Sequence, residues 1–171
     1  MNYSLPFTVL VDNDAHAPGL ATEHGLSIWI DTGEARILFD TGQSDAFLKN
    51  AQRLGIDLST ADRLVLSHGH YDHAGGFGAL EDLLPEQTPI HAHPDIFPER
   101  YSRHADGTMR EVGLPKSARQ FLRRREAYFH PTPDATEIIP DVWVTGFVPR
   151  VTPFEDTGGD FWLDRECTRP D

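Results

Sequence analysis

The chain has 171 residues, of which 39% are hydrophobic, enough for one folded domain (1–171) with its own core. It carries 15 Lys and Arg against 27 Asp and Glu, a formal net charge of −12. Such an acidic surface repels nucleic acid and anionic membranes, so neither is an expected partner. No apolar run reaches membrane-spanning length, the first residues lack a signal-peptide pattern, and Cys167 has no second cysteine to pair with, so we expect a cytoplasmic protein.

Short strands and turns alternate in the first part of the chain. Strand-like runs of apolar residues are found at 7–11, 26–30 and 35–39. The sequence Asp-Thr-Gly-Glu between the second and third runs predicts a hairpin turn, and Asp-Thr-Gly recurs at 40–42. A helix is expected next, with Ser44 as its N-cap and Gly55 at its end, because the apolar residues between them recur on one helical face.

Strands and helices continue to alternate in the rest of the chain. The expected strands are at 63–66, 89–93 and within 137–148, and the expected helices at 77–84 and 117–127. Ser117 and Gln120 form a capping-box pattern for the second helix. Trp143 and Phe147 are expected in the core, and residues 152–171 as an irregular tail. This order predicts an α/β (α+β) fold with a mixed sheet.

The most informative stretch is Ser-His-Gly-His-Tyr-Asp-His-Ala-Gly-Gly at 67–76, which follows an apolar strand. His68 and His70 are two apart, so an extended backbone points both side chains the same way. Asp72 and His73 are adjacent, so they diverge and can reach a second position. One loop can therefore supply two ligands to each of two divalent metal ions, expected to be Zn²⁺, with Mn²⁺ and Fe²⁺ as alternatives. A structural turn with chance histidines explains this spacing less well.

The pattern His-x-His-x-Asp-His after an apolar strand resembles the signature of the metallo-β-lactamase-fold hydrolases. Other stretches resemble one branch of that superfamily, the 7,8-dihydropterin-6-ylmethyl-4-(β-D-ribofuranosyl)aminobenzene 5′-phosphate synthase-like proteins. They are LVDN at 10–13, EHGLS at 23–27, LFDTGQS at 38–44, HAHPDIF at 91–97 and VTGFVPR at 144–150. The resemblance covers nearly the whole chain and implies an αβ/βα sandwich made of two similar halves.

The resemblance implies a role for each residue of the motif. His68 and His70 would hold the first metal ion, and Asp72 and His73 the second. Asp72 would also be catalytic, because its other carboxylate oxygen can orient the hydroxide that the two ions share. Asp40 would orient one of the ligand imidazoles from behind, although a simple turn residue at the end of a strand fits its position equally well.

Much of the C-terminal half of that fold is not recognisable in this sequence. In the superfamily this half brings a further histidine for each metal ion and a bridging aspartate. The branch has a Gly-Cys-Ser-His-like stretch there, but Cys167 is not followed by His. Two protein ligands would leave each zinc ion open. We expect a fragment or truncated product of a longer enzyme, because an exposed half-core is unstable alone, or else a homodimer or other chain that completes the site.

Two further histidines are candidates for the pocket. His93, in the stretch His-Ala-His-Pro, either lines the pocket or has a structural role, and His24 lies in the stretch Glu-His-Gly. The expected function is a metal-dependent hydrolase in which an activated hydroxide attacks a phosphate ester or a related small-molecule substrate. The alternative is a catalytically inert, truncated metal-binding half-domain that acts as an interaction or ligand-sensing module.

Overall fold

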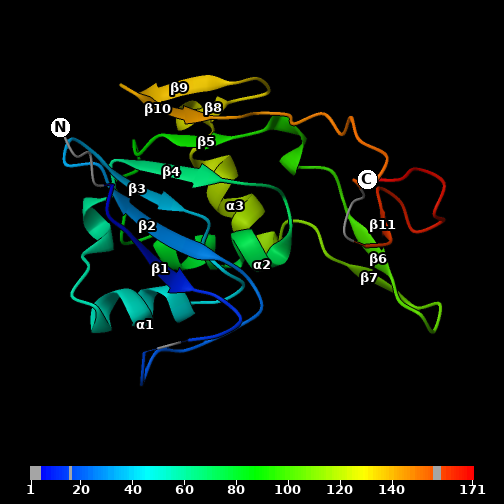
Figure 1. Cartoon of the computed structure of the whole chain (residues 1–171), viewed down its shortest axis with the longest axis horizontal. Coiled ribbons are helices and arrows are strands. Elements are labelled where there is room, and N and C mark those ends of the chain that lie inside the picture. The colour runs from blue at the N-terminus through cyan, green and yellow to red at the C-terminus, as the bar shows by residue number, and fades with distance from the viewer. Residues whose placement is uncertain (1–4, 16, 156–158) are drawn as a thin grey trace.

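The computed structural model of the chain describes residues 5–15, 17–155 and 159–171. Its largest part is a six-stranded sheet in the order β1-β2-β3-β4-β5-β8 (Figure 1). The strands are β1 (Phe7–Val11), β2 (Ser27–Asp31), β3 (Arg36–Phe39), β4 (Arg63–Leu66), β5 (Ile90–Ala92) and β8 (Phe129–Pro131). The first three strands form an antiparallel meander, and β3, β4, β5 and β8 run parallel. A mixed sheet with interleaved helices confirms the predicted α/β class.

Helices cover one face of this sheet. The α-helices are α1 (Ala46–Arg53), α2 (Tyr71–Ala74) and α3 (Lys116–Arg124), and the 3-10 helices are η1 (Leu58–Thr60), η2 (Gly75–Leu80), η3 (Pro94–Ile96) and η4 (Glu126–Tyr128). Alternate residues of each strand point to this side, so Leu38, Leu64 and Ile90 join one buried cluster with the helices. Phe77 and Phe121 stack within it, with ring centroids 5.3 Å apart. No helix in the described part of the chain has the length and apolar character needed to cross a bilayer.

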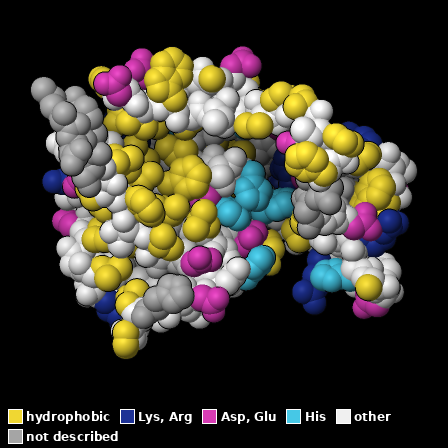
Figure 2. Space-filling view, in the orientation of Figure 1, with side chains coloured by type: hydrophobic (Ala, Val, Ile, Leu, Met, Phe, Trp, Pro, Cys, Tyr) yellow, Lys and Arg dark blue, Asp and Glu magenta, His cyan; other side chains and the backbone are white. Residues whose placement is uncertain are grey.

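The opposite face of the sheet is covered chiefly by a hairpin of β9 (Thr136–Ile139) and β10 (Val142–Val144). Ile37 and Val65 of the sheet are buried against Ile138 of this hairpin. Beside the hairpin, hydrophobic side chains gather over the sheet, as Figure 2 shows. The β9–β10 hairpin therefore forms a partial second layer on the sheet.

The prediction that Trp143 and Phe147 lie in the core is wrong. Their side chains are 60% and 69% exposed, respectively. In β10, Val142 and Val144 pack against the buried cluster under the hairpin, so strand alternation turns Trp143 to the outer side. Phe147 follows the strand and lies at the rim of a cleft.

A small separate sheet closes the other end of the molecule (Figure 1). It has the order β11-β6-β7 and consists of β6 (Tyr101–Arg103), β7 (Met109–Glu111) and β11 (Phe161–Trp162). The tail predicted as irregular over 152–171 therefore contains a strand, because Phe161 and Trp162 pair with Ser102 and Tyr101. A two-residue strand has no alternation that a sequence pattern could reveal.

Two predicted helices differ from those in the structure. The helix expected at 77–84 is the 3-10 helix η2, which begins two residues earlier at Gly75. The helix expected to be capped by Ser117 is α3, which begins at Lys116 after Pro115 and has no side-chain capping bond. Proline is well suited to this helix start, because its fixed φ angle is compatible with it and its missing N–H would be unpaired there.

Gly76 lies where the histidine loop packs closely against the turn after β3 and the ring of Phe47. A Cβ at this position would overlap the ring of Phe47 and the carbonyl oxygen of Thr41. We expect Gly76→Ala to lower the free energy of unfolding by about 1–3 kcal/mol, the usual effect of forcing atoms into a filled space. Urea unfolding would measure it. Gly33→Asn is the control, because nothing lies near Gly33 and Asn tolerates its left-handed backbone; equal losses in both variants would contradict the packing argument.

Candidate metal centre

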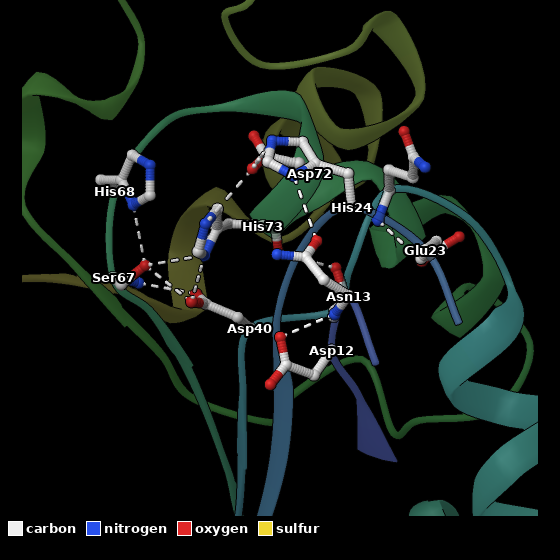
Figure 3. Close-up of polar contacts among 11 residues, drawn as sticks. Asp12, Asn13, Glu23, His24, Asp40, Ser67, His68, Asp72 and His73 are labelled. Atoms are coloured by element: carbon white, nitrogen blue, oxygen red, sulfur yellow. Dashed lines mark hydrogen bonds and ion pairs between the residues drawn. The ribbon is translucent and has the colours of Figure 1, made fainter. Parts of the chain in front are cut away.

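The loop that follows β4 brings the residues of the histidine motif together. β4 ends at Leu66 in the parallel part of the sheet, so the loop emerges at the carboxyl ends of the strands. The ring centroid of His68 lies 4.6 Å from that of His70 and 4.2 Å from that of His73. Nε2 of His73 lies 3.5 Å from Oδ2 of Asp72 (Figure 3). The structure thus places all four predicted ligands in one cluster.

Asp40 lies behind this cluster and is fully buried. Its Oδ2 accepts a hydrogen bond from Nδ1 of His73 at 2.7 Å and from Oγ of Ser67 at 2.6 Å, and its Oδ1 accepts one from the backbone N–H of Ser67 at 2.8 Å (Figure 3). The structure therefore places Asp40 in contact with one imidazole of the motif. Asp40 also ends its strand with a left-handed backbone, φ 55°, so it is a turn residue as well.

The surroundings of His68 and His73 shift the pKa values of these two side chains in opposite directions. Burial lowers the pKa of His68 to about 4, helped by the neighbouring His73 and His70. Burial acts on His73 in the same sense, but the hydrogen bond and the charge of Asp40, together with the charge of Asp72, outweigh it and raise the pKa of His73. At neutral pH His68 is therefore a neutral imidazole with a lone pair available to a cation.

His24 reaches the cluster from the loop before β2. Its Nε2 lies 3.4 Å from Oδ2 of Asp72, and its Nδ1 lies 3.2 Å from Oδ1 of Asn13 (Figure 3). The next residue, Gly25, has φ 139°, and a Cβ there would overlap the carbonyl oxygen of Asp72. The predicted pocket residue His24 is therefore adjacent to the motif, and Gly25 allows this close approach.

Glu23 connects this loop to the turn after β3 by hydrogen bonds, a contact that was not predicted from the sequence. Its carboxylate accepts hydrogen bonds from the backbone N–H groups of Gln43 and Ser44, and one from Oγ of Ser44 at 2.5 Å. The same turn contacts the histidine loop, because Gly75 donates its N–H to the carbonyl of Gly42 at 2.8 Å. Glu23 therefore supports the segment that positions Asp40.

A cleft of about 790 Å³ opens beside the cluster. His68 and His70 line it together with His93, the second predicted pocket residue. His93 also caps the start of η3, where its Nδ1 accepts the N–H of Asp95 at 3.1 Å. Both proposed roles of His93, pocket wall and structural residue, are thus compatible with its position.

Residues distant in sequence complete the walls of this cleft. The Phe161 ring lies 5.0 Å from that of His70, and Nε of Arg100 bonds to Oδ2 of Asp171 at 2.8 Å. The same Asp171 oxygen lies 3.7 Å from Nε2 of His70, too far for a hydrogen bond. No motif in the sequence marks Phe161, Arg100 or Asp171, because only the fold brings them to the histidine loop.

The comparisons with known proteins agree with this geometry. The family model of the metallo-beta-lactamase superfamily matches residues 21–165. The chain belongs to this superfamily. A solved metal-dependent hydrolase of the same superfamily is 30% identical and superposes with a TM-score of 0.67, over 98% of this chain and 57% of the other.

Two relatives from Methanocaldococcus jannaschii match most of the chain. One is an uncharacterised protein, 34% identical over 86% of this chain and 55% of its own length. The other is a 7,8-dihydropterin-6-methyl-4-(beta-D-ribofuranosyl)-aminobenzene-5'-phosphate synthase, 26% identical over 82% of this chain and 49% of its own length. The resemblance to this branch of the superfamily is thereby confirmed. The chain spans about half the length of the relatives it matches.

The donor atoms of the cluster fit the divalent metals that this superfamily generally binds. Imidazole nitrogens and carboxylate oxygens are the ligands that zinc and related ions prefer, and the buried Nε2 of His70 has no hydrogen-bond partner. Within the described ranges, no three His, Cys, Asp or Glu side chains converge on one point as a complete metal site. The cluster therefore offers ligand atoms of the right kind but forms no complete metal site among the described residues.

Proposed function

We propose that this chain carries the N-terminal part of the binuclear metal site of a metal-dependent hydrolase. His68 and His70 would hold one divalent ion, and Asp72 and His73 the other. The observation that carries the proposal is the gathering of these four side chains in one loop, with Asp40 against His73 at 2.7 Å. Zn²⁺ is the ion that this donor set favours, ahead of Mn²⁺ and Fe²⁺.

The ions and the residues around the loop would have separate roles in the reaction. The ions, when bound, would lower the pKa of a water and polarise the bond to be cleaved. Oδ2 of Asp72 lies within 3.5 Å of both His24 and His73. A carboxylate has a second oxygen, so Asp72 would serve a cation with one oxygen and accept a proton from water with the other. His24 would steady that carboxylate from the solvent side.

The cleft would take a small anionic substrate such as a phosphate ester. Arg100 and Arg150 both line it, but the guanidinium of Arg100 already bonds to Asp171 and to the carbonyl of Asp95. Arg150 forms no hydrogen bond or ion pair with the described residues. Its charge acts on the nearby Glu155, and its guanidinium would be the cation that meets a phosphate or carboxylate. Phe147 and Phe161 would border the organic part of the substrate.

The remaining metal ligands would come from beyond this copy of residues 1–171. The matched relatives are about twice as long as their aligned region. A downstream half, as the fold resemblance implies, would be the first candidate, and a second copy of this chain the other. If neither supplies ligands, the chain would be the inert metal-binding module considered as the alternative.

Metal binding by the isolated chain tests the proposal. At a free Zn²⁺ or Co²⁺ concentration of 100 times Kd, binding would add about 2.7 kcal/mol to stability and raise Tm by roughly 5–10 °C for a domain of this size. Asp72→Ala should remove the part of this rise that the second ion contributes, and His130→Ala, at an exposed histidine on β8, should leave the rise unchanged. No metal-dependent change in Tm in the unaltered chain would refute the proposal.

Hydrolysis of bis(4-nitrophenyl) phosphate distinguishes the active from the inert alternative. The chain joined to its downstream half should cleave this ester in the presence of Zn²⁺ or Mn²⁺, whereas the chain alone should be far slower. Activity of the chain alone, together with a dimer in sedimentation, would mean that a second copy supplies the missing ligands. Metal binding without hydrolysis by any of these forms would support the inert module.

A further inference from the structure

The hydroxyl of Ser67 is placed between the buried Asp40 and the ring of His68. Its Oγ lies 2.6 Å from Oδ2 of Asp40 and 2.9 Å from Nδ1 of His68 (Figure 3). It also lies 3.4 Å from Nδ1 of His73. One hydroxyl thus contacts the Asp40 carboxylate and the imidazoles of both His68 and His73.

The direction of these hydrogen bonds follows from counting protons. A hydroxyl has one proton to donate, and a carboxylate can only accept, so the proton of Ser67 is directed to Asp40. The Ser67 oxygen must then accept from His68, which places a hydrogen on Nδ1 of His68. Since a neutral imidazole carries one N–H, its Nε2 is left with a free lone pair.

The same count applies to His73. Its Nδ1 lies 2.7 Å from the Asp40 carboxylate, so this nitrogen is the donor, and its Nε2 lies 3.5 Å from Oδ2 of Asp72. Asp40 therefore sets the proton on His73 directly and, through the Ser67 hydroxyl, the proton on His68. No comparable contact is found for His70, whose Nε2 has no hydrogen-bond partner in the described residues.

We infer that Ser67 is a positioning residue that links the two metal positions by fixing the tautomer of His68 against Asp40. This inference rests on the proposed function, in which His68 and His73 serve different ions. It explains how the buried carboxylate of Asp40 can fix the ring protons of one histidine at each metal position. His73 contacts this carboxylate directly, whereas His68 contacts it through the hydroxyl of Ser67. Partners of this kind that hold a ligand histidine typically contribute 10–100-fold in metal affinity.

The test compares Ser67→Ala with Ser67→Thr. Because Ser67 is exposed, the loss of its hydroxyl should leave the fold intact, which circular dichroism would verify. We expect Ser67→Ala to weaken Co²⁺ binding about 10–100-fold, measured from the visible absorption of the bound ion, and Ser67→Thr to restore it. Ser59→Ala is the matched control, because Oγ of Ser59 donates to Asp57 at 2.6 Å in η1, away from the loop.

The tautomer of His68 gives a second readout, which needs no metal. In nitrogen-15 NMR spectra of the metal-free chain, His68 should carry its proton on Nδ1, and Ser67→Ala should shift part of that population to Nε2. Unchanged Co²⁺ affinity in Ser67→Ala, or an Nε2 proton on His68 in the unaltered chain, would overturn the inference. If the unaltered chain binds no metal, the proposed function fails, whereas loss of the Nδ1 signal in Ser67→Ala would still establish that Ser67 sets the tautomer.

Discussion

Asp40→Ala is expected to cause the largest loss at the candidate metal centre. The substitution leaves the Nδ1 proton of His73 and the backbone N–H of Ser67 without an acceptor in a position from which solvent is excluded. Removing one partner of a buried charged hydrogen-bond pair typically lowers the free energy of unfolding by about 3–5 kcal/mol. In addition, the backbone at this position is left-handed, with φ 55°, a conformation that alanine rarely adopts.

The same change should weaken metal binding at both proposed positions. Without Asp40, neither His68 nor His73 has its Nδ1 proton held in place, so we expect metal affinity to fall by at least the 10–100-fold typical for one such partner. Titration with Co²⁺ would measure the affinity and urea unfolding the stability. Asp40→Asn should lose affinity with less destabilisation, because Asn tolerates the backbone and keeps one acceptor oxygen.

The sequence contains a matched control for this experiment. Asp31, Thr32 and Gly33 repeat the tripeptide of Asp40 to Gly42. The partly exposed carboxylate of Asp31 has local partners: it accepts the N–H of Gly33 at 2.8 Å and lies 3.9 Å from Nε of Arg36. We expect Asp31→Ala to cost less than about 1 kcal/mol and to leave metal affinity unchanged. A loss in Asp40→Ala no greater than in Asp31→Ala would show that Asp40 is only a turn residue.

The histidine cluster could be predicted from the sequence because its members are near neighbours. Their positions follow from a strand, an extended backbone and a tight loop, all local features. Asp40 could be proposed only through the family resemblance, since the repeated Asp-Thr-Gly does not by itself distinguish a buried carboxylate from the exposed Asp31. The contact between Asp40 and His73 spans 33 residues, a separation that no local pattern encodes.

The predicted fold was correct where strands are regular and wrong where they are short or have one exposed side. Five of the six strands of the main sheet were predicted, because they carry apolar residues on the helix-covered face. The sixth, β8, was missed, as were β6 and β7; these strands have only three residues each, and several residues of β6 and β7 are charged. Trp143 was expected to be buried on its hydrophobicity alone. Which side of β10 is covered depends on the layer next to it, and among the described residues its outer side has no such layer.

A fall in stability at mildly acidic pH is the second large effect we expect, and it originates at His91 rather than in the metal cluster. His91 is 8% exposed on the sheet face opposite the helices, and neither of its ring nitrogens has a hydrogen-bond partner in the described residues. Its ring stacks on that of His130 in the neighbouring strand, with centroids 5.2 Å apart. Burial, together with the charges of His130 and Arg63, lowers the pKa of His91 to about 4.

The direction of this pH dependence follows from proton binding by His91 in the unfolded and folded states. The unfolded chain has an ordinary histidine pKa of about 6.5, so between pH 6.5 and 4 it binds a proton that the folded chain excludes. Unfolding is therefore favoured as the pH falls through this range, and the contribution of His91 to the free energy of unfolding should fall by up to about 3 kcal/mol. Above pH 6.5 both states are neutral at His91, and its contribution should be constant.

Urea unfolding between pH 4 and 8 measures this dependence, and the difference between the unaltered chain and His91→Leu isolates it from other buried histidines such as His68. Leucine suits the apolar surroundings of Ile37 and Val65 on this face and cannot titrate, so His91→Leu should flatten the slope below pH 6.5. His104→Ala, on the exposed hairpin between β6 and β7, should leave the slope unchanged. Parallel stability curves for the unaltered chain and His91→Leu would mean that His91 accepts its proton in the folded state as readily as in the unfolded one.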